Sequence, residues 1–158
     1  MRKAYHYTSR KNYYDMVRGG FLRALSPILD FGTELNKSLM VPEGKFLFCL
    51  IDSPEPEGWK EFGGLAKLFE SISIDKQSRE LMLLSFNLTQ SDKAYVLEEA
   101  YPFLRNPGRP DYPRNCWRLY LDSMVELHNY DGSYILPVVV VGNDIDIRRV
   151  SLERAVEV

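Results

Sequence analysis

Cysteine and histidine are both scarce in this 158-residue chain, which holds two of each. Cys49 lies within an apolar run and Cys116 within a polar one, so their spacing indicates neither a disulfide framework nor a set of metal ligands. With only His6 and His128, a catalytic zinc site is also hard to assemble. We therefore expect a protein without a bound metal that works in a reducing compartment, which places it in the cytoplasm.

The sequence also lacks the motifs of common nucleotide-binding and hydrolase folds. Its glycine pairs at 19–20 and 63–64 are too sparse for a P-loop or a dinucleotide-binding loop, and no G-x-S-x-G turn is present. No apolar run is long enough to cross a membrane, and the start of the chain has no signal-peptide pattern. The formal net charge of −2 gives no general attraction to nucleic acid or to membranes. These absences argue against standard kinase, hydrolase and membrane functions.

The composition that is present, 45% hydrophobic and 13% aromatic, suits one folded domain over residues 1–158. Its most informative stretch begins with a predicted strand from Ala4. Because side chains alternate along a strand, His6 and Thr8 share one face while Tyr5 and Tyr7 share the other. A histidine beside a hydroxyl on the less apolar face suggests a site. The alternative is a half-buried histidine with no role beyond packing.

A helix is predicted directly after this strand, over Arg10–Arg18. Ser9 can cap its free amides, and Gly19 or Gly20 can end it in the left-handed conformation. The apolar stripe that should face the core consists of Tyr13, Met16 and Val17. The opening of the chain therefore reads as a strand, helix and turn unit that carries a polar residue.

Apolar runs predict the remaining strands. The predicted strands are Lys45–Ile51, buried on both faces, Glu80–Leu88, Ala94–Leu97 and Tyr134–Val141. The second and third of them are separated by a short polar turn, which favours a hairpin or near-hairpin. We expect Ile145–Val150 to end the fold after a break at Gly142–Asp144.

The segments between these strands are less regular. Helices are predicted at Trp59–Ser71 and Trp117–Leu127, with an extended segment from Val125 as the alternative for the second. Residues 101–116 contain four prolines and cannot form regular structure. Their three arginines and two tyrosines suit contacts with phosphate and rings, although an exposed solvated loop is the alternative.

Two stretches resemble the ADP-ribosyltransferase-like families, which include bacterial toxin groups. The opening HYTSRKNYYDMVRGGFL is similar to their first strand and helix, and the closing YDGSYILPVVVVGNDIDIRRV is similar to their end. Together these stretches cover about a quarter of the chain. The resemblance implies a single α+β domain with a twisted, mostly antiparallel sheet, split around a cleft, and helices on the outside. It also implies the use of NAD, in a toxin or defence role.

The resemblance assigns roles to particular residues. In those families the histidine of the first strand holds the adenine-side ribose of NAD, an aromatic residue from the middle of the fold packs on nicotinamide, and a late glutamate stabilises the ribosyl cation. The residues implied to bind NAD are His6, Tyr7, Thr8, Ser9, Trp59 and Tyr95.

The late glutamate is missing from its usual place. Where it would open the last core strand, the sequence reads Leu136-Pro137-Val138, and Glu126 is the acidic residue upstream that could replace it. A carboxylate against an oxocarbenium-like state supplies about 3 to 4 kcal/mol of stabilisation in comparable sites. The alternative for Glu126 is a solvated carboxylate at a helix end, without a catalytic role.

Several functions therefore stay open. The first is an NAD-dependent ADP-ribosyltransferase or NAD glycohydrolase with His6 and Glu126 as catalytic residues. The second is a catalytically inactive module of the same fold that binds a nucleotide, nucleic acid or protein. A protein or nucleic-acid acceptor would meet the arginine-rich loop 101–116. The third hypothesis is the activity of the related RNA 2′-phosphotransferases, which rely on basic and histidine residues.

Overall fold

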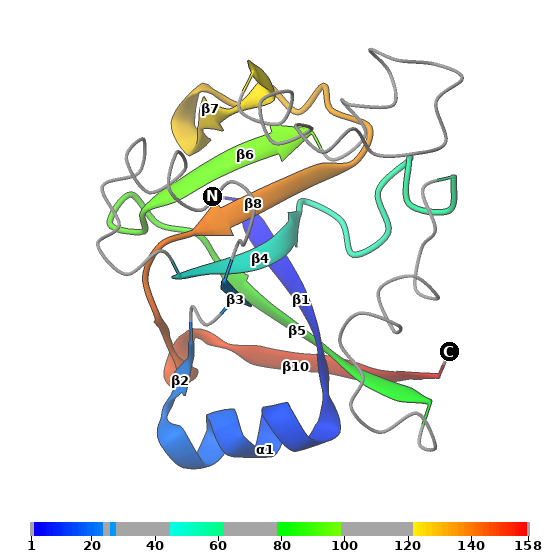
Figure 1. The fold of residues 1–158 in the computed structure, drawn as a ribbon, viewed down its shortest axis with the longest axis vertical. Coiled ribbons are helices and arrows are strands. Elements are labelled where there is room, and N and C mark those ends of the chain that lie inside the picture. The colour runs from blue at the N-terminus through cyan, green and yellow to red at the C-terminus, as the bar shows by residue number, and fades with distance from the viewer. Residues whose placement is uncertain (1, 24–25, 28–44, 62–78, 99–121, 158) are drawn as a thin grey trace.

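The computed structural model describes residues 2–23, 26–27, 45–61, 79–98 and 122–157. In this part of the chain the strands form a twisted antiparallel sheet in the order β10-β5-β1-β4-β8-β6-β7, with β3 paired to β4 beside this path, and a separate pair of β2 with β9 (Figure 1). The strands are β1 (Lys3–Ser9), β2 (Phe21–Leu22), β3 (Ser26–Pro27), β4 (Lys45–Ile51), β5 (Glu80–Asn87), β6 (Ala94–Glu98), β7 (Val125–Glu126), β8 (Pro137–Val141), β9 (Ile145–Asp146) and β10 (Ser151–Glu157). The helical elements are α1 (Arg10–Gly19) and the 3₁₀ turns η1 (Leu127–Asn129) and η2 (Ile147–Arg149).

The opening strand and helix form where the sequence predicts them. The Ser9 hydroxyl accepts a hydrogen bond of 3.1 Å from the Asn12 amide and so caps α1. Gly20 closes the helix at a φ of 84°, a left-handed conformation that a side chain would strain. Met16 is buried against the sheet, but Val17 is 47% exposed, so the predicted apolar stripe is wrong at Val17.

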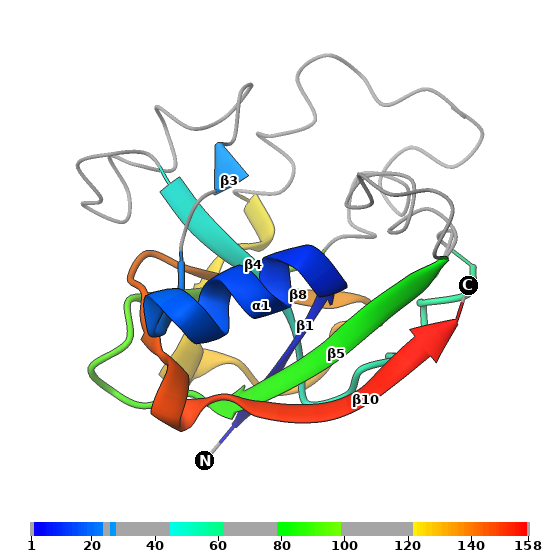
Figure 2. The same ribbon diagram turned by 90° about the horizontal axis from the view of Figure 1, so that it is seen from below.

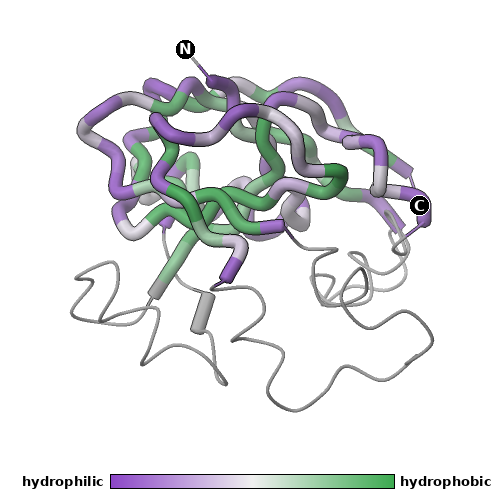
Figure 3. The backbone as a smooth tube through the Cα atoms, turned by 90° about the horizontal axis from the view of Figure 1, so that it is seen from above, coloured by the Kyte–Doolittle hydropathy of each residue, from purple (hydrophilic) through white to green (hydrophobic). Residues whose placement is uncertain are grey.

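The sheet buries side chains on both of its faces, as predicted for Lys45–Ile51. Leu47, Cys49 and Ile51 belong to the cluster that packs with α1, while Phe46 and Leu50 belong to clusters on the opposite face. Figure 2 shows α1 lying across β1 and β5. In Figure 3 the hydrophobic stretches of the backbone lie mainly inside the fold and the hydrophilic stretches mainly along its outline. The core is therefore two-sided, with the central strands between its halves.

The predicted hairpin between Glu80–Leu88 and Ala94–Leu97 is wrong. Both strands exist, but β5 pairs with β1 and β10, whereas β6 pairs with β8 and β7. The turn between them, at residues 88–93, carries the chain from one half of the sheet to the other. β5 and β6 pair instead with β1 and β8, two inner strands that carry buried apolar residues, and this burial favours the long-range pairing.

Three further boundaries differ from the predictions. In the described part of the predicted helix Trp117–Leu127, only residues 122–123 are α-helical, Val125 pairs with Val96 as part of β7, and Leu127 begins the 3₁₀ turn η1. The predicted strand Tyr134–Val141 begins only at Pro137. The fold does not end at Val150, because β10 follows and pairs with β5 along the edge of the sheet.

Several predictions fall outside the described residues. These are most of the helix predicted at 59–71, the first part of the helix predicted at 117–127, and the loop 101–116. Residues 59–61, which are described, form a turn. None of the helices in the described ranges is long and apolar enough to cross a membrane.

The sheet opens between β1 and β4. Only two residue pairs join these strands, Ala4 with Ile51 and Tyr5 with Leu50. Beyond Tyr5, β1 continues beside β5 as far as Ser9, while β4 continues beside β8 and β3. Figure 1 shows the two strands diverging from their shared end. We call this feature the β1/β4 split.

Candidate functional site

His6 lies at the inner end of the β1/β4 split. If the register of Ala4 with Ile51 continued, Tyr7 would stand opposite Phe48, but that pair does not form. Instead, Nδ1 of His6 lies 2.9 Å from the backbone oxygen of Phe48. Because a carbonyl oxygen only accepts, Nδ1 carries the proton and donates it. The imidazole thus takes the place of a ladder hydrogen bond.

The surroundings of His6 favour its neutral form. Burial lowers the pKa of His6 below its ordinary value of 6.5, and the hydrogen bond to Phe48 offsets this only in part. With the proton on Nδ1, the other ring nitrogen, Nε2, presents a lone pair. Among the described residues nothing donates a hydrogen bond to it. His6 can therefore accept a hydrogen bond from the hydroxyl group of a ligand.

Thr8 shares the face of β1 that carries His6, whereas Ser9 caps α1. Thr8 is 5% exposed, and its hydroxyl has no hydrogen-bond partner within the described ranges. A buried hydroxyl is stabilised by a hydrogen-bond partner, so that of Thr8 is suited to bind a polar group. The hydroxyl of Ser9 is already occupied by the Asn12 amide. As far as the described ranges show, Thr8 is the one of these two residues whose hydroxyl is free to bond beside His6.

The side chain of Tyr7 lies on the opposite face, where it meets Trp59. Their rings stack with centroids 5.7 Å apart and planes 13° apart. The Tyr7 hydroxyl donates a hydrogen bond of 3.0 Å to the Pro54 oxygen. Burial, followed by the charge of Glu55, raises the pKa of Tyr7 to about 12, so the phenol stays protonated. The structure thus brings together two of the predicted NAD-binding side chains, on the face away from His6.

The backbone of Tyr7 faces the split. The bond from the Asp52 amide to the Lys3 oxygen shows that Lys3 is hydrogen-bonded toward β4, and this direction recurs at every second residue, hence at Tyr5 and Tyr7. At Tyr7 the partner strand has already turned away. An amide N–H and a carbonyl therefore border the split without a ladder pair.

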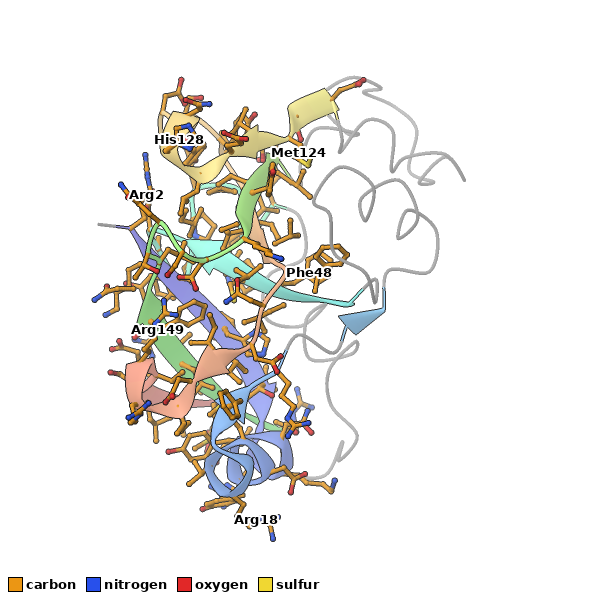
Figure 4. The ribbon with its side chains drawn as sticks, turned by 90° about the vertical axis from the view of Figure 1, so that its left-hand side faces the viewer. Arg2, Arg18, Phe48, Met124, His128 and Arg149 are labelled. Atoms are coloured by element: carbon orange, nitrogen blue, oxygen red, sulfur yellow. The ribbon has the colours of Figure 1, made fainter. Side chains whose placement is uncertain are left out.

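Tyr95 and Glu126 are neighbours of each other but not of His6. They pair across β6 and β7, at the edge of the sheet. Four strand spacings separate β7 from β1, which is about 19 Å of sheet. Glu126 is exposed and its carboxylate lies 3.3 Å from the ring of His128. Figure 4 labels Phe48, whose backbone oxygen bonds to His6, and His128, the partner of Glu126, and it shows them in different parts of the molecule. The structure does not bring the two predicted catalytic residues together.

A buried carboxylate that the predictions missed lies at the start of β8. Glu98 accepts hydrogen bonds of 2.8 Å from the Ile135 amide and 2.9 Å from the Leu136 amide. It is 4% exposed, and its own amide donates to the Ser123 hydroxyl. Both carboxylate oxygens hold the segment that leads into Pro137. The sequence signal for this role is the first of two glutamates that follow the apolar run of β6.

Cys49 adjoins His6 without forming a reactive pair. Its sulfur lies 3.9 Å from Nδ1 of His6, and burial raises the pKa of the Cys49 thiol. A protonated, buried thiol is a poor nucleophile, so Cys49 serves packing. The described ranges contain no group of three or more side chains that could hold a metal ion.

Comparisons with known proteins found no match to this chain among protein-family models, curated proteins or solved structures.

Proposed function

We propose that this chain is an ADP-ribosyltransferase-like protein that binds NAD, or a related nucleotide, at the β1/β4 split. The observation that carries the proposal is the backbone of Tyr7, which has no ladder partner among the described strands, beside a neutral His6. Nicotinamide carries a primary carboxamide, whose N–H and oxygen complement the N–H and carbonyl of Tyr7. The ribose hydroxyls complement Nε2 of His6 and the hydroxyl of Thr8. The split would then be the inner end of the ligand cleft that the resemblance implies.

The distance of Glu126 from His6 favours a protein that binds NAD over an enzyme that uses Glu126 to cleave it. A carboxylate stabilises an oxocarbenium-like state only in direct proximity. Glu126 lies about four strand spacings from His6, or roughly 19 Å. We therefore favour a nucleotide-binding module over a transferase that uses Glu126. Cytoplasmic location and a toxin or defence role belong to the proposal and rest on cysteine usage and on the resemblance.

Thermal unfolding with and without NAD tests the proposal. A ligand that binds only the folded state stabilises it by about 2.7 kcal/mol at a hundredfold excess over Kd, so the melting temperature should rise. His6→Ala should reduce this rise. His128→Ala is the matched control, since His128 is exposed and remote, and should leave the rise unchanged. If millimolar NAD does not raise the melting temperature of the folded protein, the proposal that the protein binds this dinucleotide is refuted.

A further inference from the structure

The segment between η2 and the middle of β10 lies at the edge of the sheet, where Glu153 accepts hydrogen bonds from the hydroxyl of Ser85 and, at 2.8 Å, from Lys3. Before the bulge between Leu152 and Arg154, only two ladder pairs join β10 to β5, Ser151 with Ser85 and Leu152 with Leu84. The 3₁₀ turn η2 precedes them. Ser151 is exposed, and β10 is an edge strand whose outer side has no neighbour in the described sheet. Such an edge segment can open locally while the rest of the sheet stays folded.

The side chains around Ser151 present a charge pattern. Arg148, three residues before it, is 86% exposed, and within the part of the chain that the structure describes its ion-pair partner is the nearby Asp146. Leu152, directly after the serine, is 45% exposed. A surface ion pair such as that of Arg148 is weak and easily exchanged for another carboxylate. An exposed arginine, a serine and an apolar residue at these spacings match the charge pattern that basophilic protein kinases read.

The second arginine of this segment is not available in the same way. Arg149 donates two hydrogen bonds, of 3.0 and 2.6 Å, to Asp92, whose side chain is 2% exposed. Removing it would leave a buried carboxylate without its cation. Recognition must therefore fall on Arg148, while Arg149 anchors η2 and limits the opening to the residues that follow.

We propose that Ser151 is a phosphorylation site for a basophilic serine kinase that recognises Arg148. In the reaction the Ser151 Oγ attacks the γ-phosphorus of ATP bound with Mg²⁺ in the kinase. The bond from that phosphorus to ADP breaks, ADP leaves with the electron pair, and the serine proton passes to the aspartate of the kinase. The proposal is independent of NAD binding, because Ser151 lies on the edge strand and the β1/β4 split lies two strands inward.

The test treats the folded full chain with the catalytic subunit of cAMP-dependent protein kinase and Mg-ATP, followed by intact and peptide mass spectrometry. We expect one phosphoryl group per chain, on Ser151, and none in Ser151→Ala. Arg148→Ala should lower kcat/KM by about tenfold or more, the loss of one charge-assisted contact, whereas Arg154→Ala, three residues after the serine, should not.

Two outcomes would overturn the proposal. In the first, the kinase phosphorylates a synthetic peptide of residues 147–153 but leaves the folded chain unmodified. This result would show that Ser151 is not accessible to the kinase in the folded protein. In the second, phosphorylation persists in Ser151→Ala. Circular dichroism of each variant verifies that it is folded.

Discussion

Nδ1 of His6 donates a hydrogen bond of 2.9 Å to the backbone oxygen of Phe48, at the point where β1 and β4 part. The bond satisfies a carbonyl that continued pairing would have offered to the Tyr7 amide. It also fixes the tautomer of the ring and leaves Nε2 as an acceptor. One side chain therefore stabilises the split and prepares it for a ligand.

Stability should depend on pH through His6. Its pKa in the folded state lies below the ordinary 6.5, because burial disfavours the imidazolium. The unfolded chain then binds the proton more readily, so the contribution of His6 is complete above pH 6.5 and is lost as the pH falls toward the folded pKa. Urea unfolding should give a lower free energy of unfolding at pH 5 than at pH 7.5, and the loss can reach about 2 kcal/mol, because one proton changes it by at most about 1.4 kcal/mol per pH unit below 6.5. His6→Asn, which keeps a donor but does not titrate, should lack this loss, and parallel pH curves for both proteins would contradict the assignment.

Arg149 and Asp92 form a partly buried ion pair. Burial alone would raise the pKa of Asp92, but hydrogen bonds from Arg149, Thr89 and Asn143 outweigh it and lower the pKa from 3.8 to about 2. The carboxylate therefore stabilises the fold above pH 3.8, and that contribution disappears as the pH falls toward 2.

Removing Arg149 should therefore leave a buried charge. We expect Arg149→Ala to lower the free energy of unfolding at pH 7 by about 3 kcal/mol. Adding Asp92→Asn should recover part of the loss, because the unpaired charge is removed. Chemical denaturation of both proteins measures the difference, and a double variant less stable than Arg149→Ala would argue against this explanation.

Glu126 should be dispensable. It is exposed, and its partner is the exposed His128, so Glu126→Gln should change the free energy of unfolding by less than about 0.5 kcal/mol. NAD binding should be unchanged for the same reason. Calorimetric titration of NAD into both proteins checks this. A large loss of binding in Glu126→Gln, or of any NAD hydrolysis that the parent shows, would return Glu126 to the site.

The cap of α1 should contribute measurably to the free energy of unfolding. Ser9→Ala removes the acceptor for the Asn12 amide and should cost about 1 kcal/mol of stability. Ser151→Ala is the control, because this exposed serine starts a strand and caps no helix. Equal stability of the two variants, measured by urea unfolding, would mean that the cap contributes nothing.

Local signals in the sequence were sufficient for the elements that carry them. The Ser9 cap, the Gly20 stop and the apolar runs of β4 and β5 each depend on neighbouring residues, and the structure confirms all of them. The strand β10 was missed because its exposed sequence SLERAVE has neither an apolar run nor a regular alternation. It gains its order from pairing with β5, which no local pattern records.

The arrangement of the site could be predicted only in part. The face shared by His6 and Thr8 follows from the alternation of one strand. The split follows from a divergence of β1 and β4, which lie about 40 residues apart in sequence. For the same reason the distance of Glu126 from His6 was not predictable, since it depends on the order of five strands.

The most direct test of NAD binding at the β1/β4 split is a titration followed by NMR on isotope-labelled protein. We predict that NAD shifts the Tyr7 amide and the His6 ring signals together, with a common saturation curve, and leaves the signals of Glu126 and His128 unmoved. Saturating NAD that moves none of these signals in the folded protein, or that moves those of β7 and leaves Tyr7 and His6 unchanged, would contradict this prediction.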